Sequence, residues 1–353
     1  MSLPRSTRRL VLASKPTGKV NLSTTFKLET KDLALPLQPN QVLLKTLYIS
    51  NDPAQRTWIQ AGADPARSYT PPVNEGETMR AMNLSSILDS TCSEPWLAKG
   101  KLITTTSGWA EYAVMNASTC QPVPELPGLD PTHFLGAFAI TGATALYGLE
   151  VVRTSSKDKV AVVSGAAGAT GSMAVQIAKR ILGVEKVIGI AGTADKCRWV
   201  ETDLGADLCV NYKDSDFEAK LAEATGRKAD VYFDNVGGEI TDFMLSCMAR
   251  NGRIAACGGI SRYDDSGDGA MKMKNWMQIV AMRLEIKGFI IFDVAARLME
   301  MRETLVKAYQ DGKIKVDDQS QTVVEADLEG VPEVWQRLYS GGNTGKLLTK
   351  LKL

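Results

Sequence analysis

Histidine is almost absent from this chain of 353 residues, which contains only His133, and its six cysteines include no C-x-x-C pair. Zinc sites are built mainly from Cys and His ligands, so we predict a protein without a metal site. The dispersed cysteines also exclude a disulfide framework and are typical of a reducing compartment. We interpret His133, in "LDPTHFLGAF", as a residue at a helix start or in the packing.

An excess of charge and long apolar runs are missing as well. Lys and Arg total 41 and Asp and Glu total 40, which gives a formal net charge of +1. This balance excludes a nucleic acid or an anionic membrane surface held by bulk electrostatics, so any ligand has to be recognised locally. No apolar stretch approaches the ~20 residues that span a bilayer. We therefore expect a cytoplasmic protein.

The length predicts two domains, because a single hydrophobic core rarely extends beyond roughly 250–300 residues. Up to about Leu129 the sequence consists of short β-rich runs such as "RLVLAS", "KVNLSTTFKLET" and "NQVLLKTLYIS". From His133 onward, short β-branched runs alternate with helical periods, which is typical of a doubly wound parallel sheet. The run "VAARLMEMRETLVKAYQDGKIKV", which starts at Val294, predicts a long helix at the end of this region. The C-terminal residues return to a strand–helix–strand pattern. We predict an α/β protein with a mostly β domain at 1–132 and 315–353 and a Rossmann domain at 133–314.

The stretch "VVSGAAGATGSMAVQIAKR" contains a variant of G-x-G-x-x-G, with Ala166 in the first glycine position followed by Ala167, Gly168 and Gly171. Alone, this run could be only a tight turn between a strand and a helix. A strand at 160–163, a helix from about Ser172 to 181 and a second strand at 186–190 surround it, and this β-α-β context favours dinucleotide binding. Gly168 would let a pyrophosphate approach the backbone, and Gly171 would let the helix pack closely on the sheet.

The end of the second strand predicts which dinucleotide is bound. An NAD site usually has a carboxylate there, whereas this sequence reads Ala191-Gly192-Thr193. Thr193, Lys196 and Tyr212 could instead surround a 2′-phosphate, with Lys196 as the cation, which favours NADPH. Alternatively, Lys196 and Arg198 only solvate a helix start.

Segments along nearly the whole chain resemble the zinc-independent branch of the medium-chain dehydrogenase/reductase superfamily, in the group of prostaglandin reductases, alkenal double-bond reductases and curcumin reductases. These segments are "LYISNDPAQR", "PPVNEGETMRA", "GWAEYAV", "ITGATALYGL", the glycine loop, "FDNVGG", "GRIAACGGISRYDD" and "GGNTGKLL". Two departures leave the substrate open: Ala54 stands where relatives often have an aromatic residue, and residues 82–103 are unusual.

The resemblance implies a GroES-like catalytic domain, a Rossmann domain, NADPH as hydride donor, and a homodimer. It implies reduction of the C=C bond of α,β-unsaturated ketones or aldehydes. Thr193, Lys196 and Tyr212 match the 2′-phosphate contacts. Asn51, Ala167, Asn235 and Asn343 complete the expected cofactor residues, and Tyr263 matches the active-site tyrosine.

Tyr263 also follows from the fold, because it lies in the loop after "GRIAAC", at the edge of the sheet where doubly wound folds bind ligands. Alternatively, it is a surface tyrosine on a charged loop, and whether it donates a proton or only orients a carbonyl stays open. Trp58, Tyr69, Phe289 and Phe292 are candidates for an apolar pocket wall or for ordinary core. Two other functions also stay open: a quinone or enoyl reductase of a biosynthetic pathway, and a non-catalytic dinucleotide-binding protein.

Overall fold

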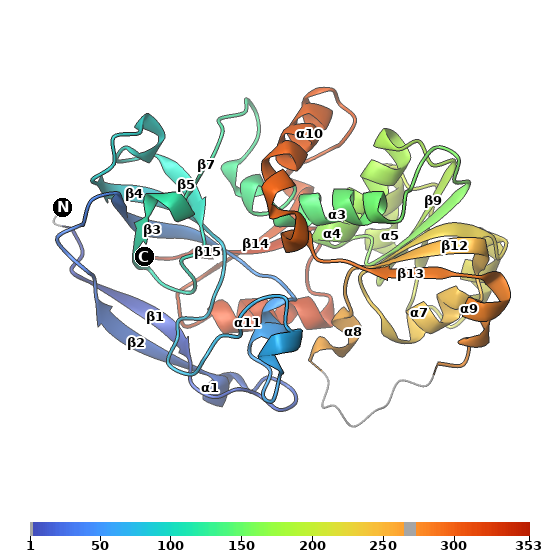
Figure 1. The fold of residues 1–353 in the computed structure, drawn as a ribbon, viewed down its shortest axis with the longest axis horizontal. Coiled ribbons are helices and arrows are strands. Elements are labelled where there is room, and N and C mark those ends of the chain that lie inside the picture. The colour runs from blue at the N-terminus through green and yellow to red at the C-terminus, as the bar shows by residue number, and fades with distance from the viewer. Residues whose placement is uncertain (1–2, 265–272) are drawn as a thin grey trace. The chain divides into compact units, whose positions relative to one another are not determined.

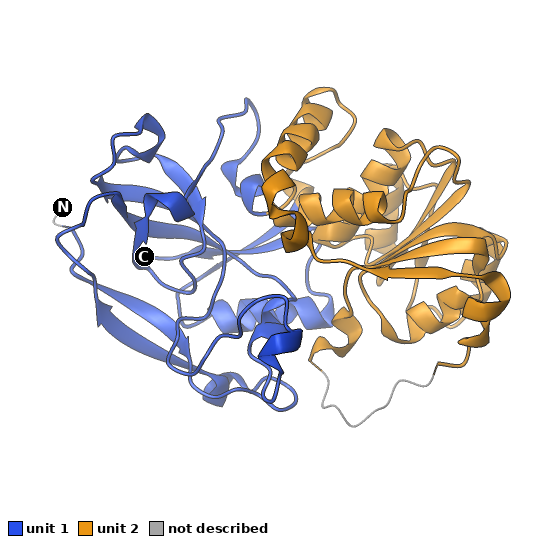
Figure 2. Ribbon diagram, viewed as in Figure 1, with its two compact units in different colours: residues 1–135, 321–353 blue, residues 136–320 orange. Residues whose placement is uncertain are grey.

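A computed structural model describes residues 3–264 and 273–353, which fold into two compact units (Figure 2). Unit 1 comprises residues 1–135 and 321–353, and unit 2 comprises residues 136–320. In the described part of the chain, every helix is too short or too polar to cross a membrane.

Unit 2 is built on a six-stranded sheet in the order β10-β9-β8-β11-β12-β13, in which all neighbouring strands are parallel (Figure 1). Its strands are β8 (Val160–Ser164), β9 (Lys186–Ala191), β10 (Leu208–Asn211), β11 (Ala229–Asp234), β12 (Met248–Ala256) and β13 (Glu285–Gly288). Counted along the unit, this is the order 3-2-1-4-5-6 of a Rossmann fold. The predicted fold class is therefore confirmed.

Helices cover both faces of this sheet, with α3 and α4 on one side and α7 and α9 on the other (Figure 1). The helices are α3 (Ile140–Val151), α4 (Ala169–Gln176) with its π-helical continuation η5 (Ile177–Ile181), α5 (Ala194–Thr202), α6 (Phe217–Thr225), α7 (Gly238–Leu245), α8 (Ile260–Tyr263), α9 (Met277–Met282), η6 (Ile291–Arg297), α10 (Leu298–Gln310) and η7 (Asp318–Ser320). Because both faces are covered, the central strands are apolar on both sides, and Val162, Ile188 and Tyr232 are fully buried.

Two helix starts differ from the sequence prediction. The helix after the glycine loop begins at Ala169 instead of Ser172, because Gly168 is its N-cap and its carbonyl oxygen accepts a hydrogen bond from the Ser172 N–H at 2.8 Å. The long helix expected from Val294 begins only at Leu298, because Val294 has non-helical backbone angles (φ −118°, ψ 32°).

Unit 1 contains a seven-stranded sheet in the order β14-β15-β3-β4-β5-β7, with β6 pairing to β3, and a separate two-stranded sheet of β1 and β2. The strands are β1 (Ser6–Leu12), β2 (Phe26–Asp32), β3 (Gln41–Ser50), β4 (Asn83–Ser90), β5 (Leu102–Thr105), β6 (Tyr112–Asn116), β7 (Gln121–Pro122), β14 (Gln321–Ala326) and β15 (Lys346–Leu351). Strand β15 pairs antiparallel with β3, so N-terminal and C-terminal segments share this sheet.

The helices of unit 1 are short. They are α1 (Leu22–Thr25), α2 (Gln55–Trp58), η1 (Pro65–Arg67), η2 (Pro95–Leu97), η3 (Ala117–Thr119), η4 (Pro131–Leu135), α11 (Val331–Gln336) and η8 (Arg337–Ser340). Helix α1 corrects the expectation of one β-rich run over "KVNLSTTFKLET": the Asn21 side chain caps a helical turn by accepting from the Ser23 N–H at 3.1 Å. Phe26, Trp109 and Trp335 then pack together in the core of the unit, with ring centroids 4.9–6.1 Å apart.

Candidate functional site

The loop between β8 and α4 is shaped by glycines that approach one another closely. Gly165 has a positive φ of 59°, a conformation that favours glycine. A Cβ on Gly171 would lie 2.1 Å from the Gly165 carbonyl oxygen, so only glycine fits there without a shift of the backbone. Ala166, in the first position of the predicted motif, is fully buried, and Gly165 supplies the turn one residue earlier.

This geometry fits the pyrophosphate of a dinucleotide. The loop folds back on itself before α4, and Gly168, the N-cap of that helix, carries no side chain that would cover the first N–H groups. Those N–H groups and the helix dipole make the helix start suitable for an anion. Ala167 and Gly168 are therefore kept as proposed cofactor residues.

Thr193, Lys196 and Tyr212 come together beyond the ends of β9 and β10. The Tyr212 N–H donates to the Ala191 carbonyl oxygen at 2.9 Å, and a Cβ on Gly192 would lie 2.7 Å from the Tyr212 ring. The ring thus lies against Gly192, at the end of β9 where an NAD site usually has its carboxylate. The Thr193 hydroxyl caps α5 by accepting from the Lys196 N–H at 3.2 Å, which leaves the hydroxyl able to donate.

Lys213 is a second cation in this cluster, and it is not among the residues predicted from the sequence. Its ammonium lies 5.8 Å from the centre of the Tyr212 ring. Burial lowers the pKa of Lys196, and the positive charge of Lys213 lowers it further. Arg198, by contrast, pairs with Asp195 on the surface at 3.1 Å. Two cations that repel each other beside a tyrosine and a threonine hydroxyl fit a phosphate group.

Asn235 links the ends of the two strands at which the strand order reverses. Its side-chain amide donates to the Ser164 carbonyl oxygen at 2.7 Å, and its backbone N–H donates to the Ser164 hydroxyl at 3.0 Å. The preceding Asp234 is buried and accepts hydrogen bonds from three side-chain hydroxyls of unit 2, Tyr232 at 2.9 Å, Ser164 at 3.1 Å and Thr241 at 2.5 Å. Asp234 therefore fixes this loop, and Asn235 lies in the crevice where doubly wound folds bind ligands.

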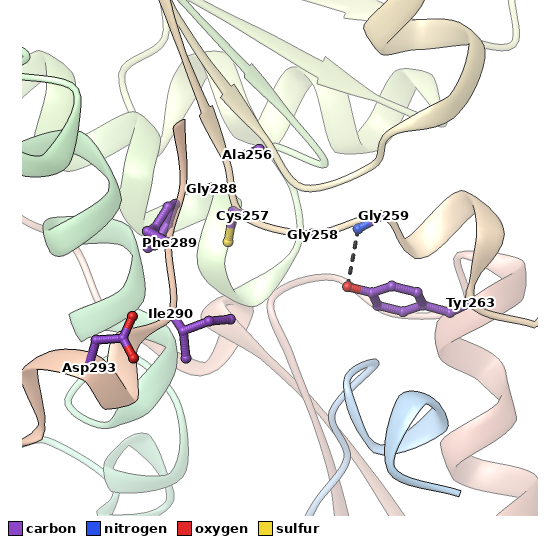
Figure 3. Close-up of a pocket in the computed structure, with 9 residues that line it drawn as sticks. All are labelled: Ala256, Cys257, Gly258, Gly259, Tyr263, Gly288, Phe289, Ile290 and Asp293. Atoms are coloured by element: carbon purple, nitrogen blue, oxygen red, sulfur yellow. Dashed lines mark hydrogen bonds between the residues drawn. The ribbon is translucent and has the colours of Figure 1, made fainter. Parts of the chain in front are cut away.

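Tyr263 lies at the end of α8, directly after the loop that leaves β12. Its hydroxyl oxygen accepts a hydrogen bond from the Gly259 N–H at 3.1 Å (Figure 3). A Cβ on Gly258 would lie 3.1 Å from this oxygen, so the loop closes tightly around the phenol. A phenol can accept one hydrogen bond and donate another, and the bond it accepts polarises its O–H and makes it a stronger donor. Asp265, the last residue of the "GGISRYDD" segment, lies outside the described residues.

Tyr263 faces a cavity of about 430 Å³ within unit 2 (Figure 3). Nine residues line it: Ala256, Cys257, Gly258, Gly259, Tyr263, Gly288, Phe289, Ile290 and Asp293. The cavity therefore brings Tyr263 and the predicted Phe289 together. The predicted Phe292 is exposed and is not one of the nine.

Cys257 places a thiol on the wall of this cavity, and burial together with the nearby Asp234 raises its pKa to about 12. The thiol is therefore protonated near neutral pH. A protonated thiol is a poor nucleophile, because the thiolate is the reactive form.

The remaining predicted residues lie in unit 1. Trp58 donates from its indole N–H to the Tyr69 hydroxyl at 2.9 Å, and the Arg80 guanidinium stacks 5.4 Å from the Trp58 ring. The buried Asn51 donates to the Thr349 hydroxyl at 3.0 Å, and Asn343 donates to the Gly345 carbonyl oxygen at 2.7 Å. Trp58 and Tyr69 thus form one hydrogen-bonded aromatic pair.

Metal-ligating side chains are dispersed in the described residues, which contain no group of three or more His, Cys, Asp or Glu suited to a metal ion. His133 is buried in the 3-10 segment η4. The six cysteines are all free.

Two family models match the chain, one described as zinc-binding dehydrogenase over residues 169–308 and one as N-terminal domain of oxidoreductase over residues 8–123. The NADPH-dependent curcumin reductase of Escherichia coli is 31% identical, with 98% of this chain and 96% of that protein covered. The NADP(+)-dependent 2-alkenal reductase of Nicotiana tabacum is 30% identical, with 97% and 96% covered.

A solved structure of similar fold is that of CurA from Vibrio vulnificus in complex with NADPH, with a TM-score of 0.86, 31% identity and coverage of 98% of this chain and 99% of that one. The likeness extends through both units and is not confined to the glycine loop. Together, the Rossmann unit, the mostly β unit and relatives that are 30% and 31% identical over almost their whole length show that the chain belongs to the medium-chain dehydrogenase/reductase superfamily, in the group that includes the curcumin and alkenal reductases.

Proposed function

We propose that this protein is a zinc-free, NADPH-dependent reductase of the C=C bond of α,β-unsaturated ketones or aldehydes. The observation that supports this proposal best is the cavity at the carboxyl end of β12, where a tyrosine hydroxyl polarised by the Gly259 N–H faces an otherwise largely apolar wall. A flat enone fits such a wall, since small-molecule sites are mostly apolar with few polar groups. The relatives named for curcumin and alkenal reduction support this reaction class.

The residues that would hold NADPH are the backbone of the glycine loop for the pyrophosphate and the cluster of Thr193, Lys196, Tyr212 and Lys213 for the 2′-phosphate. Bound there, NADPH supplies a hydride. Asn235 would lie beside the cofactor because it spans the crevice between β8 and β11. Asn51 and Asn343 are kept as proposed cofactor residues, and Trp58 and Tyr69 as proposed pocket residues, on the resemblance of their segments.

Tyr263 would act on the carbonyl group of the substrate. When a hydride reaches the β-carbon, negative charge develops on the carbonyl oxygen, and a neutral phenol can donate to it without bringing a charge into the cavity. The Gly259 N–H would then strengthen that donation by its own bond to the phenol oxygen. A proton taken up at the α-carbon completes the reduction.

We further propose a cytoplasmic homodimer formed through β13. This strand is at the edge of the six-stranded sheet, where its outer side can pair with the same strand of a second copy. Large apolar side chains on and near it are exposed: Trp276, Met277, Val280 and Ile286. Light scattering at micromolar concentration should give twice the chain mass, and the change Ile286→Lys should give a monomer.

The reaction is tested by following NADPH consumption with enones, enals and quinones, with the products identified by NMR. We expect saturated ketones from enones, with no loss of activity after dialysis against a chelator. Activity confined to quinones would favour the quinone reductase alternative. Cofactor binding without turnover of any substrate would favour a non-catalytic dinucleotide-binding protein.

A further inference from the structure

The cavity beside Tyr263 contains one charged side chain, that of Asp293. The other lining residues supply an aromatic ring, aliphatic groups, glycine backbone, the Cys257 thiol and the Tyr263 hydroxyl. Figure 3 draws the Asp293 carboxylate next to Ile290, apart from Tyr263 on the other side of the view. A single carboxylate among mostly apolar walls therefore gives this part of the cavity a negative charge.

No partner in the described residues neutralises that charge. Asp293 lies in η6, and its backbone N–H donates to the Ile290 carbonyl oxygen at 3.1 Å, but no ion pair or hydrogen bond of the described residues involves its carboxylate. Arg297, four positions along the chain, binds Glu150 at 2.8 Å and contacts Glu300 at 3.5 Å. The cation nearest in sequence is thus paired with other carboxylates.

The negative charge of Asp293 can discriminate between anionic and neutral substrates. An anionic group brought close to an unneutralised carboxylate is repelled, and such like-charge contacts are a recognised source of specificity. A neutral substrate avoids this repulsion. The effect should be moderate because Asp293 is exposed, and water and salt weaken interactions of exposed charges.

We propose that Asp293 is a specificity-determining residue, which makes this site select neutral enones and reject enones that carry a carboxylate at the end remote from the reacting double bond. The inference rests on the proposed enone reduction and adds a substrate class to it. Two plainer roles compete with it. Asp293 is in the first turn of η6, where a carboxylate interacts favourably with the helix dipole, and it could also accept a hydrogen bond from the amide of the nicotinamide.

The test uses benzylideneacetone derivatives with a para-carboxylate or its methyl ester, assayed with the wild-type full-length chain and the Asp293→Asn variant. The two compounds differ in intrinsic reactivity, so the ester-to-acid ratio of kcat/KM in the variant is compared with the same ratio in the wild type. We expect the ester-to-acid ratio of the variant to be roughly tenfold lower than that of the wild type, equivalent to about 1.4 kcal/mol. The matched control is Asp318→Asn, which removes an exposed carboxylate that is not among the lining residues of the cavity.

Ionic strength separates a charge effect from a change of shape. The wild-type preference for the ester should shrink as salt is raised, while that of Asp293→Asn should stay constant. An unchanged ester-to-acid ratio in Asp293→Asn overturns the proposal, as does a ratio that falls equally in Asp318→Asn. A variant that changes only the KM for NADPH assigns Asp293 to the nicotinamide and also overturns it. If the wild type reduces neither compound nor any other enone, the proposed function itself has failed.

Discussion

Two loops leave the carboxyl edge of the same parallel sheet, and they are held in different ways. The loop from β8 to α4 is fixed by its own backbone, with Gly165 at positive φ and Gly171 too close to the Gly165 carbonyl oxygen for any side chain. The loop from β12 to α8 is fixed by a side chain, since the Tyr263 hydroxyl accepts from the Gly259 N–H. The constraints of the first loop lie within seven consecutive residues, from Gly165 to Gly171. The cavity beside the second loop needs residues from two separate segments, 256–263 and 288–293.

Because of this difference, the first loop is suited to binding a common cofactor and the second to selecting a particular substrate. A loop determined by its backbone can hold the same pyrophosphate in many proteins, because the contacts do not depend on neighbouring side chains. A cavity lined by Tyr263, Cys257 and Asp293 can change its preference with a single substitution. Fold and cofactor can therefore be shared with relatives while the substrate differs.

The largest effect expected is that of Gly171→Ala, which breaks the first loop. Its Cβ would lie 2.1 Å from the Gly165 carbonyl oxygen and 2.9 Å from the Ala166 Cα, so the backbone has to move. We expect a loss of stability of about 3 kcal/mol or more, measured by urea unfolding. Gly168→Ala is the matched control, because its Cβ would meet only that same oxygen at 3.2 Å.

Gly168→Ala should keep its stability within about 1 kcal/mol and bind NADPH more weakly, because the new methyl group lies where the pyrophosphate approaches. The pair thus separates folding from binding. Equal stability of the two variants would show that the loop can adjust freely and that its close packing does not matter.

The second prediction sharpens the role of the other loop. Tyr263→Phe should lower kcat with an enone by at least ~10-fold, since a bond to the developing enolate strengthens in the transition state. If the phenol also delivers the proton, the loss should reach ~10²–10⁴-fold. Steady-state kinetics measure the kcat of the variant, and its affinity for NADPH is measured separately by fluorescence.

The control is Tyr309→Phe, which removes a phenol packed against Phe138 and should leave kcat unchanged. An unchanged kcat in a folded Tyr263→Phe variant that binds NADPH would assign enolate stabilisation to other groups.

The sequence predicts the part of this picture that depends on local spacing. The strand–loop–helix pattern around Gly168, the missing carboxylate after Ala191 and the position of Tyr263 after a strand can all be seen in short windows. Lys213 could have been found as well, because it follows Tyr212 at the end of a strand that parallel order places beside Thr193.

Asp293 had no comparable signal. Its place on the wall of the cavity beside Tyr263 depends on the pairing of β12 with β13, which sequence periodicity does not specify. The helix starts at Ala169 and Leu298 were misplaced for a related reason. Each depends on the backbone of a single residue, the cap at Gly168 and the break at Val294, whose neighbours do not interrupt the helical pattern.

The third prediction concerns the phosphate cluster. Lys196→Ala should lower the preference for NADPH over NADH by about tenfold or more, because charge-assisted bonds to phosphate contribute ~1.5–3 kcal/mol each. Phosphate binds the protonated amine, so this preference should fall as pH rises through the lowered pKa of Lys196, earlier than for an ordinary lysine. Lys213→Ala removes one cause of the lowered pKa of Lys196, so the preference for NADPH should be lost at a higher pH in this variant than in the wild type. The kcat/KM for NADH serves as the control, because it should change little in either variant. If the preference does not depend on Lys196, the 2′-phosphate is bound elsewhere.

The smallest effect expected is on Cys257, and it ties the cavity to the chemistry of its substrate. Enones are electrophiles that alkylate thiolates, so the proposed function requires a cysteine in this cavity to stay protonated. Burial, with a contribution from Asp234, raises the pKa of this thiol to about 12. The thiolate fraction near neutral pH is then only about one part in 10⁴ to 10⁵, against a few per cent for a free cysteine.

Iodoacetamide should therefore leave Cys257 almost unmodified near neutral pH, as measured by mass spectrometry of its peptide with N-acetylcysteine as the reference thiol. Its modification rate should rise about tenfold per pH unit up to the raised pKa. Rapid alkylation near neutral pH would mean that the cavity does not protect the thiol, and the site would then have to tolerate an adduct during turnover.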